Sequence, residues 1–329
     1  MLPLPDSRPV QSESPVTGRW LSRLFWLNLV VEGLIVLSGG LVRLSGSGLG
    51  CPDWPDCVSG SLIPVAHQAQ SWHKFVEFGN RTLTGLVSIV AVALLVAVWR
   101  WAPYRKGLRL PVALILLGIA VQAVVGGISV HLKLNPFIVA AHFLISMVLV
   151  AASAWLVWRD REGDAPPKPT ARREVRLAAY AASVMGAVVL VLGTMVTGAG
   201  PHSGDATQPA RLHIDVRSIA WMHADSVMLF CGLVVATWLG CRLVATTRRS
   251  AKAWLLVLVV TALQGILGYT QYFLGVPSPL VELHMLGATL LVIALTWGVL
   301  SLRERTQESP AEPAAPPARD RQRAPDRSR

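Results

Sequence analysis

Eight long apolar runs constrain the fold of this chain more than any other feature of its sequence. They fall at about residues 24–44, 82–101, 110–130, 137–158, 175–197, 218–243, 251–274 and 280–302. Each has roughly the 20 mostly apolar residues that a helix needs to cross the hydrocarbon core of a bilayer. Hydrophobic residues make up 53% of the 329 residues and charged residues only 15%, a balance that is rare in water-soluble domains. We therefore predict an all-α integral membrane protein with eight transmembrane helices and the lipid bilayer as its solvent.

The basic residues are distributed unevenly between the loops, and this predicts the orientation. Most lie at 100–109, 159–176 and 242–252 and in the two terminal segments, which all fall on one side of the membrane. The other side carries only Arg43, Lys74, Arg81, Lys133, Arg211 and Arg217. Because loops rich in Lys and Arg stay in the cytoplasm, both termini are predicted to be cytoplasmic. We interpret the formal net charge of +11 as a topology signal and expect no nucleic-acid partner.

Polar segments divide the chain into two halves. Residues 1–22 lack the features of a cleaved signal peptide and, like the tail 304–329, are expected to be disordered in the cytoplasm. Between them we expect an N-terminal four-helix half at 23–158 and a C-terminal four-helix half at 175–303, joined by a cytoplasmic linker at 159–174.

The two halves share a sequence pattern. The segment QAVVG at 122–126 corresponds to QGILG at 264–268, and each is followed by a histidine 20 residues after its glutamine, namely His142 and His284. The shared spacing predicts that four helices were duplicated. An even number of helices per half makes the two repeats parallel.

The halves differ at one position that carries chemistry. Counting back 61 or 62 residues from each of these histidines gives Asn80 in the first half and His223 in the second. His223 and His284 fall at similar depths in their helices, so we expect two imidazoles on neighbouring helices to bind one haem iron from opposite faces. The alternative is that each histidine only makes hydrogen bonds inside the bundle.

The first half offers a different set of groups. His142 is a candidate iron ligand, and Glu77 lies three residues before Asn80, so the two share one helix face. One strong iron ligand beside a carboxylate suggests a place where a second haem is chemically changed. The alternative is that Glu77 forms a salt bridge with Arg81 at the i,i+4 spacing.

Two further groups lie on the predicted outer side. Cys51 and Cys57 fall in the first outer loop, where a disulfide is permitted, and free thiols that pass reducing equivalents are the alternative. Arg43, Arg81 and Arg217 lie at helix ends near the predicted haems. Their guanidinium groups are candidates for binding haem propionates, and snorkelling to the membrane interface is the alternative.

Several of these segments together resemble haem A synthases. They are GGLVRLSGSGLGCPDWPDC at 39–57, HKFVEFGNR at 73–81, NPFIVAAHF at 135–143, GTMVTGAGPHSGD at 193–205, WMHAD at 221–225 and ELHMLGA at 282–288. The resemblance runs through all eight predicted spans. It implies a bacterial plasma-membrane enzyme that oxidises the C8 methyl group of haem O to a formyl group by successive hydroxylations. The product, haem A, would supply cytochrome oxidase.

The resemblance also implies roles for individual residues. His223 and His284 would ligate a resident haem b, His142 would be axial to the substrate haem, and Glu77 would be the essential carboxylate. Cys51 and Cys57 would match the paired outer-loop cysteines of bacterial members. Partners would be haem O, haem A, haem O synthase and an electron acceptor.

Asn80 departs from the family pattern, because many members have a histidine at this position and an amide is a poor iron ligand. We therefore expect either that His142 is the only axial ligand of the substrate haem or that another group, water included, supplies the sixth position. The main rival function is a dihaem b-type electron-transfer cytochrome without haem-modifying activity. A transporter or haem-handling chaperone is a further alternative, since parallel repeats also occur in carriers.

Overall fold

A computed structural model describes residues 17–205, 207, 209–244 and 247–305. Its elements are α1 (Arg19–Leu44), α2 (His73–Trp101), the short 3-10 helix η1 (Lys106–Leu108), α3 (Arg109–His131), α4 (Pro136–Asp160), β1 (Lys168–Pro169), α5 (Arg173–Ala199), α6 (Val216–Val244), α7 (Arg248–Phe273), α8 (Ser278–Leu300) and β2 (Arg303–Glu304). Within the described residues, 8 helices are long and apolar enough to cross a membrane. The all-α, eight-helix membrane prediction is confirmed.

The observed helices extend beyond several predicted boundaries. α1 begins at Arg19, so residues 19–22 are helical although the sequence predicted disorder up to residue 22. α2 begins at His73, nine residues before the apolar run at 82–101. Its first turns carry the buried polar residues Lys74 and Glu77, which bond to the preceding loop, so hydropathy alone does not detect them. Residues 1–16 and 306–329 of the predicted disordered termini lie outside the described residues.

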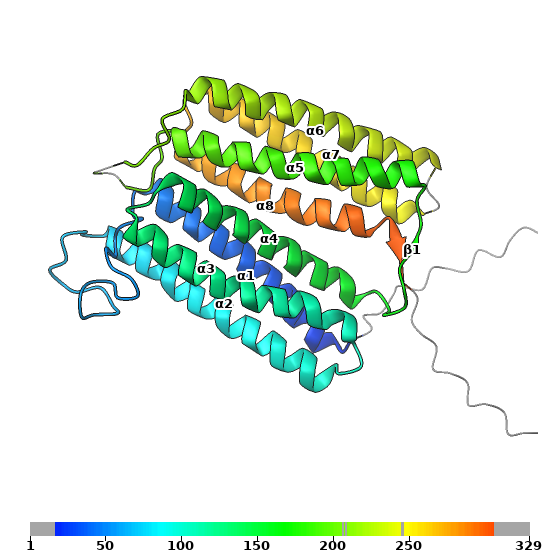
Figure 1. The fold of residues 1–329 in the computed structure, drawn as a ribbon, viewed down its shortest axis with the longest axis horizontal. Coiled ribbons are helices and arrows are strands. Elements are labelled where there is room, and N and C mark those ends of the chain that lie inside the picture. The colour runs from blue at the N-terminus through cyan, green and yellow to red at the C-terminus, as the bar shows by residue number, and fades with distance from the viewer. Residues whose placement is uncertain (1–16, 206, 208, 245–246, 306–329) are drawn as a thin grey trace, which may run out of the picture.

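The helices form two four-helix layers that lie side by side (Figure 1). In the first half α1 packs on α2 and α4, and α3 packs on α2 and α4, so α2 and α4 face each other diagonally. The second half repeats this arrangement, with α6 and α8 on the diagonal between α5 and α7. Contacts of α8 with α1 and α4, and of α4 with α5, join the halves. Buried apolar side chains gather into one cluster per half.

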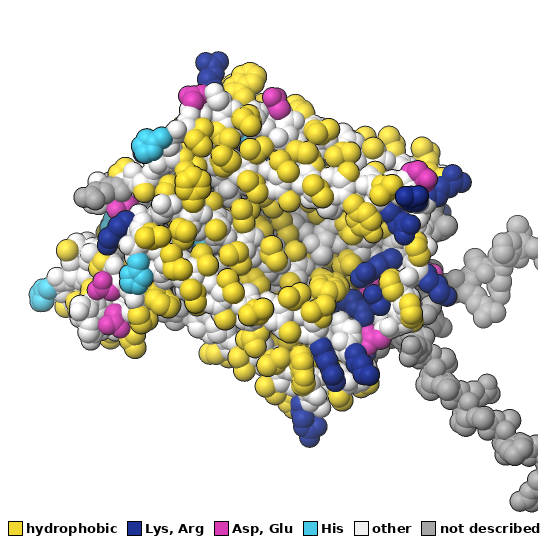
Figure 2. Space-filling model, viewed as in Figure 1, with side chains coloured by type: hydrophobic (Ala, Val, Ile, Leu, Met, Phe, Trp, Pro, Cys, Tyr) yellow, Lys and Arg dark blue, Asp and Glu magenta, His cyan; other side chains and the backbone are white. Residues whose placement is uncertain are grey.

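The surface agrees with a membrane protein. Hydrophobic side chains cover the middle of the visible face, whereas many Lys and Arg side chains gather at one end of it (Figure 2). We call this end, where residues 17–19 and 301–305 lie, the termini end. The opposite end, which carries the connection between α1 and α2, is called the loop end. The positive-inside rule predicts that the termini end is cytoplasmic.

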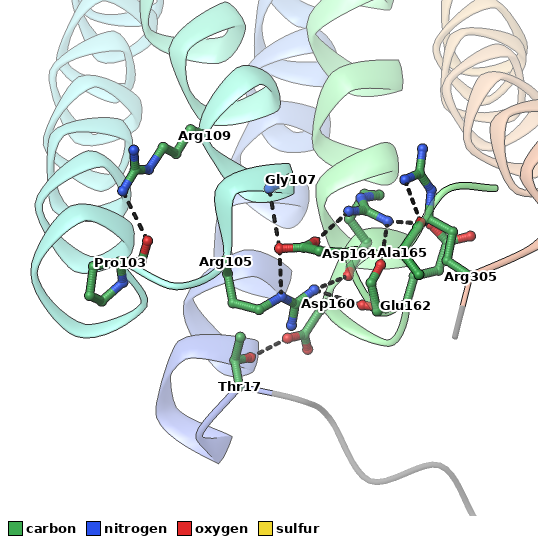
Figure 3. A network of polar contacts seen from close by, with 12 residues as sticks. Thr17, Pro103, Arg105, Gly107, Arg109, Asp160, Glu162, Asp164, Ala165 and Arg305 are labelled. Carbon is green, nitrogen blue, oxygen red and sulfur yellow. Dashed lines mark hydrogen bonds and ion pairs between the residues drawn. The ribbon is translucent and has the colours of Figure 1, made fainter. Parts of the chain in front are cut away.

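A buried polar network closes the termini end (Figure 3). Arg105 donates to the backbone carbonyls of Arg159 and Glu162 over 2.8 and 2.7 Å. The guanidinium of Arg159 pairs with the carboxylates of Glu162 and Asp164 over 2.9 and 2.7 Å. Burial, together with repulsion from Arg159, lowers the pKa of Arg305 from its ordinary value.

The same end brings distant parts of the chain together. β1 and β2 pair antiparallel, with Lys168 opposite Glu304. The predicted linker 159–174 is thus folded against residues 303–304, the second of which was predicted to belong to the disordered tail.

Candidate functional site

His223 and His284 lie toward the loop end of α6 and α8. Because these helices are diagonal to each other, the two imidazoles lie on opposite sides of the second half. The sequence predicted neighbouring helices, so this detail was wrong. Diagonal helices lie farther apart than neighbouring helices in a four-helix bundle. A flat ligand between the two imidazoles needs this wider separation, which two directly packed helices would not leave.

One hydrogen bond orients His223. Its Nδ1 lies 3.1 Å from the carbonyl oxygen of Val189 on α5. A carbonyl only accepts, so Nδ1 carries the proton and Nε2 is left with its lone pair. Metal-binding histidines commonly have this arrangement, in which the second ring nitrogen donates to a backbone carbonyl. The Nε2 atom makes no hydrogen bond within the described part of the chain.

His142, His223 and His284 are partly buried, and each lies opposite a glycine on the preceding helix. A Cβ atom built on Gly193 would lie 3.3 Å from Cε1 of His223, and one built on Gly268 would lie 3.4 Å from Cε1 of His284. In the first half the equivalent distance from Gly126 to His142 is 3.3 Å. The missing side chain therefore makes room for each imidazole ring. Sequence reasoning did not assign this role to the glycines, although two of them end the repeated segments 122–126 and 264–268.

The repeated glutamines hold the histidine backbones. Nε2 of Gln122 donates to the carbonyl of His142, and Nε2 of Gln264 donates to the carbonyl of His284, each over 2.9 Å. The glutamine that lies 20 residues before the histidine therefore makes the same hydrogen bond in both halves, as duplication would require. Duplication itself stays a prediction.

The first half has one histidine on this diagonal instead of two. Nδ1 of His142 is buried and has no hydrogen-bond partner among the described residues. Across from it on α2, Oδ1 of Asn80 accepts a hydrogen bond from the Ser38 hydroxyl over 2.6 Å. The amide oxygen is thus already engaged with α1, which gives Asn80 a structural partner and leaves His142 as the candidate ligand of this half.

Glu77 lies at the loop end of α2 and joins this helix to the outer loop. Its Oε2 accepts from the backbone N–H of Cys51 and its Oε1 from Arg81, both over 2.7 Å. The predicted salt bridge at i,i+4 spacing is therefore present. The carboxylate is almost fully buried, with 7% of the side chain exposed, so solvent screens the pair little.

Arg81 binds the outer loop rather than solvent. Its guanidinium donates to the carbonyls of Cys51, Asp53 and Asp56, each over 2.9 Å. The disulfide between Cys51 and Cys57 closes the same loop. Trp54 covers the end of α3, where a Cβ atom on Gly127 would come within 2.5 Å of its ring. Loop, disulfide and ion pair thus form one rigid cover over the loop end of the first half.

The other two predicted propionate ligands differ from each other. Arg43 donates to the carbonyls of His202 and Thr197 over 2.6 and 2.8 Å, so it ties the end of α1 to the second half. Arg217 is exposed near the start of α6. Neither arginine makes a hydrogen bond or an ion pair with the candidate iron ligands His142, His223 and His284. A propionate role for Arg43, Arg81 or Arg217 stays a prediction.

The residues on both diagonals fit a haem. A haem iron needs only axial ligands from the protein, which a pair of facing imidazoles supplies. His284 keeps a buried Nδ1 without a partner, and the glycines beside the rings leave them room. The described residues hold no group of three or more side chains suited to a bare metal ion. Two cavities of about 400 and 350 Å³ lie elsewhere, beside residues 242–252 and beside the outer loop.

Comparison with known proteins gives a consistent family assignment. Residues 22–210, more than half of the chain, match the family described as cytochrome oxidase assembly protein (COX15-CtaA). A relative from Listeria monocytogenes serotype 4a (strain HCC23), named heme A synthase, is 28% identical and the match covers 82% of this chain and 92% of the relative. Proteins of the same name from Lysinibacillus sphaericus (27% identical, 81% and 88% covered) and Bacillus mycoides (24%, 86% and 92%) are also similar.

Proposed function

The chain belongs to the cytochrome oxidase assembly protein family that includes haem A synthases, and on this premise we propose that it oxidises the C8 methyl group of haem O to the formyl group of haem A. The reaction proceeds by successive hydroxylations of that methyl group. The chain acts as a multi-pass protein of a bacterial membrane, and its product serves cytochrome oxidase.

The difference between the two diagonals carries this proposal. The second half offers two histidines, His223 and His284, whereas the first offers His142 opposite an asparagine and a buried carboxylate. Two complete bis-histidine sites would favour a cytochrome that only transfers electrons. A single ligand leaves the iron of a substrate haem less tightly held, which suits a molecule that must enter and leave.

In the second half His223 and His284 would hold a resident haem b. This group would accept and pass on single electrons when bound. Val189 fixes the His223 ring through Nδ1, and Gln264 holds the backbone at His284, so both imidazoles are positioned before a ligand arrives. Pre-positioned ligands lose little conformational entropy on binding.

In the first half His142 would bind the iron of haem O, and Glu77 would act near its oxidised methyl group. Each carboxylate oxygen of Glu77 accepts one hydrogen bond, so lone pairs remain on both. The buried carboxylate can take a proton from the substrate or stabilise positive charge that develops at the methyl carbon. Arg81 and the Cys51 N–H hold it in place during either step.

The Glu77→Gln variant tests this role. Glutamine keeps the size of the side chain and removes its charge, so we expect bound haem to be retained and conversion of haem O to stop or to end at a hydroxylated product. The measurement is chromatography and mass spectrometry of haems extracted from the purified variant, made in a host that supplies haem O.

Glu174→Gln is the matched control. It makes the same chemical change far from the site, because Glu174 is exposed in the first turn of α5. We expect it to convert haem O like the unchanged chain. Normal yields of haem A from Glu77→Gln would contradict the role proposed for Glu77. If Glu77→Gln gave normal yields of haem A while His142→Ala lost haem, the reaction would take place in the first half but would not use this carboxylate.

A further inference from the structure

Glu32 is a buried carboxyl group that the proposed reaction does not use. It lies at the middle of α1, 2% exposed, and its Oε1 atom has no hydrogen-bond partner among the described residues. Ionisable side chains inside a transmembrane helix are costly, and they commonly mark ion or proton paths.

Among the described residues of α1 and of the helices packed on it, no cation lies at the depth of Glu32. α1 packs closely on α2, α4 and α8. The titratable side chains of these four helices are all near helix ends: Arg19, Arg23 and Arg43 on α1; His73, Lys74, Glu77, Arg81 and Arg100 on α2; His142, Arg159 and Asp160 on α4; Glu282 and His284 on α8. The nearest basic residue on α1 itself, Arg23, is nine residues away, or about 13 Å along the axis. An ionised carboxylate without a partner at this depth costs several kcal/mol, so the neutral acid is the stable form.

A polar pair lies one turn from Glu32 on the same face of α1. Asn28 is fully buried, and its Nδ2 donates to the hydroxyl of Ser153 on α4 over 2.8 Å. Its Oδ1 has no partner among the described residues. At i,i+4 spacing Oδ1 of Asn28 and the carboxyl group of Glu32 are neighbours, and both lack a donor. The acid proton of Glu32, or one water between the two oxygens, supplies it.

The seam between α1 and α4 continues from this pair to the termini end. Seven residues further along α4, about 10 Å, Asp160 accepts hydrogen bonds from Thr17 and from Ser22, the latter over 2.6 Å. The contact between Thr17 and Asp160 is drawn in Figure 3. Between these two polar pairs the seam is apolar and closely packed, because Phe25, Leu29 and Leu156 are at most 5% exposed.

We propose that Glu32 is a proton-exchange site in the middle of the membrane-spanning bundle, and that Asn28 and Ser153 are the polar groups through which its proton exchanges with water. In the exchange a proton leaves the carboxyl oxygen for a water molecule, and another returns from the water. No electron moves and no other bond changes. The site needs no bound haem, so its test is independent of the proposed reaction.

Infrared difference spectroscopy tests the protonation state directly. The full-length protein is placed in lipid nanodiscs at neutral pH, and its spectrum is compared with that of Glu32→Gln. We expect the wild type to show a carbonyl stretch of a protonated carboxylic acid that is lost in Glu32→Gln and kept in Glu174→Gln. A spectrum in which Glu32→Gln loses only carboxylate bands would show that Glu32 is ionised and would overturn the proposal.

Transfer into D₂O tests the exchange. The band assigned to Glu32 is expected to shift to lower wavenumber in the folded protein, and to shift more slowly in Asn28→Leu and Ser153→Ala. A band that does not shift while the protein stays folded would show an isolated acid, and an unchanged rate in both variants would exclude the route through this pair. Either result overturns that part of the proposal.

Glu32→Gln guards against loss of folding, because its amide keeps a donor for Oδ1 of Asn28 and its thermal unfolding temperature is expected to match that of the wild type. Glu32→Leu leaves this oxygen unpaired and is expected to unfold at a moderately lower temperature. A large loss of stability in both Glu32→Leu and Glu32→Gln would instead identify Glu32 as a structural hydrogen-bonding group and would overturn the exchange role.

Discussion

The imidazole of His223 shows how single residues prepare this site. A carbonyl on α5 fixes the ring through Nδ1, and the absence of a side chain at Gly193 gives the ring space. His284 and His142 each lie beside a glycine, but their Nδ1 atoms have no backbone carbonyl as a partner in the described part of the chain. Their rings are positioned by packing and by the glutamines that hold their backbones. The histidines themselves were predicted from the sequence. Their glycine partners and the Val189 carbonyl were not, because helix packing, and not sequence spacing, sets those contacts.

At this scale we predict that His223→Ala loses the resident haem. An iron with one remaining axial imidazole binds more weakly, and the cavity left by the ring admits water. The measurement is the haem-to-protein ratio of the purified variant together with its reduced-minus-oxidised absorption spectrum. His213→Ala is the control, since His213 is exposed in the loop before α6. Equal haem content in His223→Ala and the wild type would contradict axial ligation by His223.

At the scale of whole helices, the sequence predicted the number of spans better than their boundaries. The apolar runs predicted eight spans, and the run at 137–158 matches α4, which begins one residue earlier at Pro136. The start of α2 was missed because His73, Lys74 and Glu77 make that turn polar, and these residues are satisfied by loop contacts that hydropathy does not register. Hydropathy alone therefore places the start of this helix nine residues too late, although the spacing of Glu77 and Asn80 already predicted that Glu77 lies on it. That Glu77 also anchors the outer loop was not predicted.

The contact between α7 and α8 gives a prediction at the element scale. A Cβ atom on Gly287 would overlap with the Gln264 amide, the group that holds the carbonyl of His284. Gly287→Ala should displace this glutamine and lower the free energy of unfolding by about 1–3 kcal/mol. Bound haem should fall with it. Gly265→Ala, where nothing lies within 4 Å of the new atom, is the control and should match the wild type in thermal unfolding and haem content. Identical behaviour of the two variants would contradict the positioning role of Gln264.

The whole molecule is two similar halves joined along α1, α4 and α8. Their asymmetric chemistry was visible in the sequence as Asn80 against His223, and the structure adds that each pair of candidate groups faces across a diagonal. The joint between the halves was not predicted, because sequence spacing does not show which helices of the two halves pack together. Arg43 adds hydrogen bonds to backbone carbonyls that are more than 150 residues away in the chain. Arg43 was interpreted as a propionate ligand, and its hydrogen bonds to Thr197 and His202 explain its place equally well.

At this scale we predict that Arg43→Met weakens the joint. Loss of two hydrogen bonds from a charged donor leaves the carbonyls unpaired and lowers the free energy of unfolding by about 1–3 kcal/mol. Thermal unfolding in detergent measures the effect, with Arg217→Met as the control, because Arg217 is exposed. If Arg43 acts on propionates alone, the haem-free protein will unfold at the same temperature with and without the substitution, which would contradict the tie between the halves.

The unequal halves are expected to differ in what they do with haem, and one measurement tests this directly. The full-length protein is purified from a host that makes haem O but no haem A, and the extracted haems are identified by chromatography and mass spectrometry. We predict haem b together with a formyl or hydroxymethyl derivative of haem O that is absent from the host without this protein. Haem b accompanied only by unchanged haem O would contradict the synthase account and would favour a membrane cytochrome that transfers electrons.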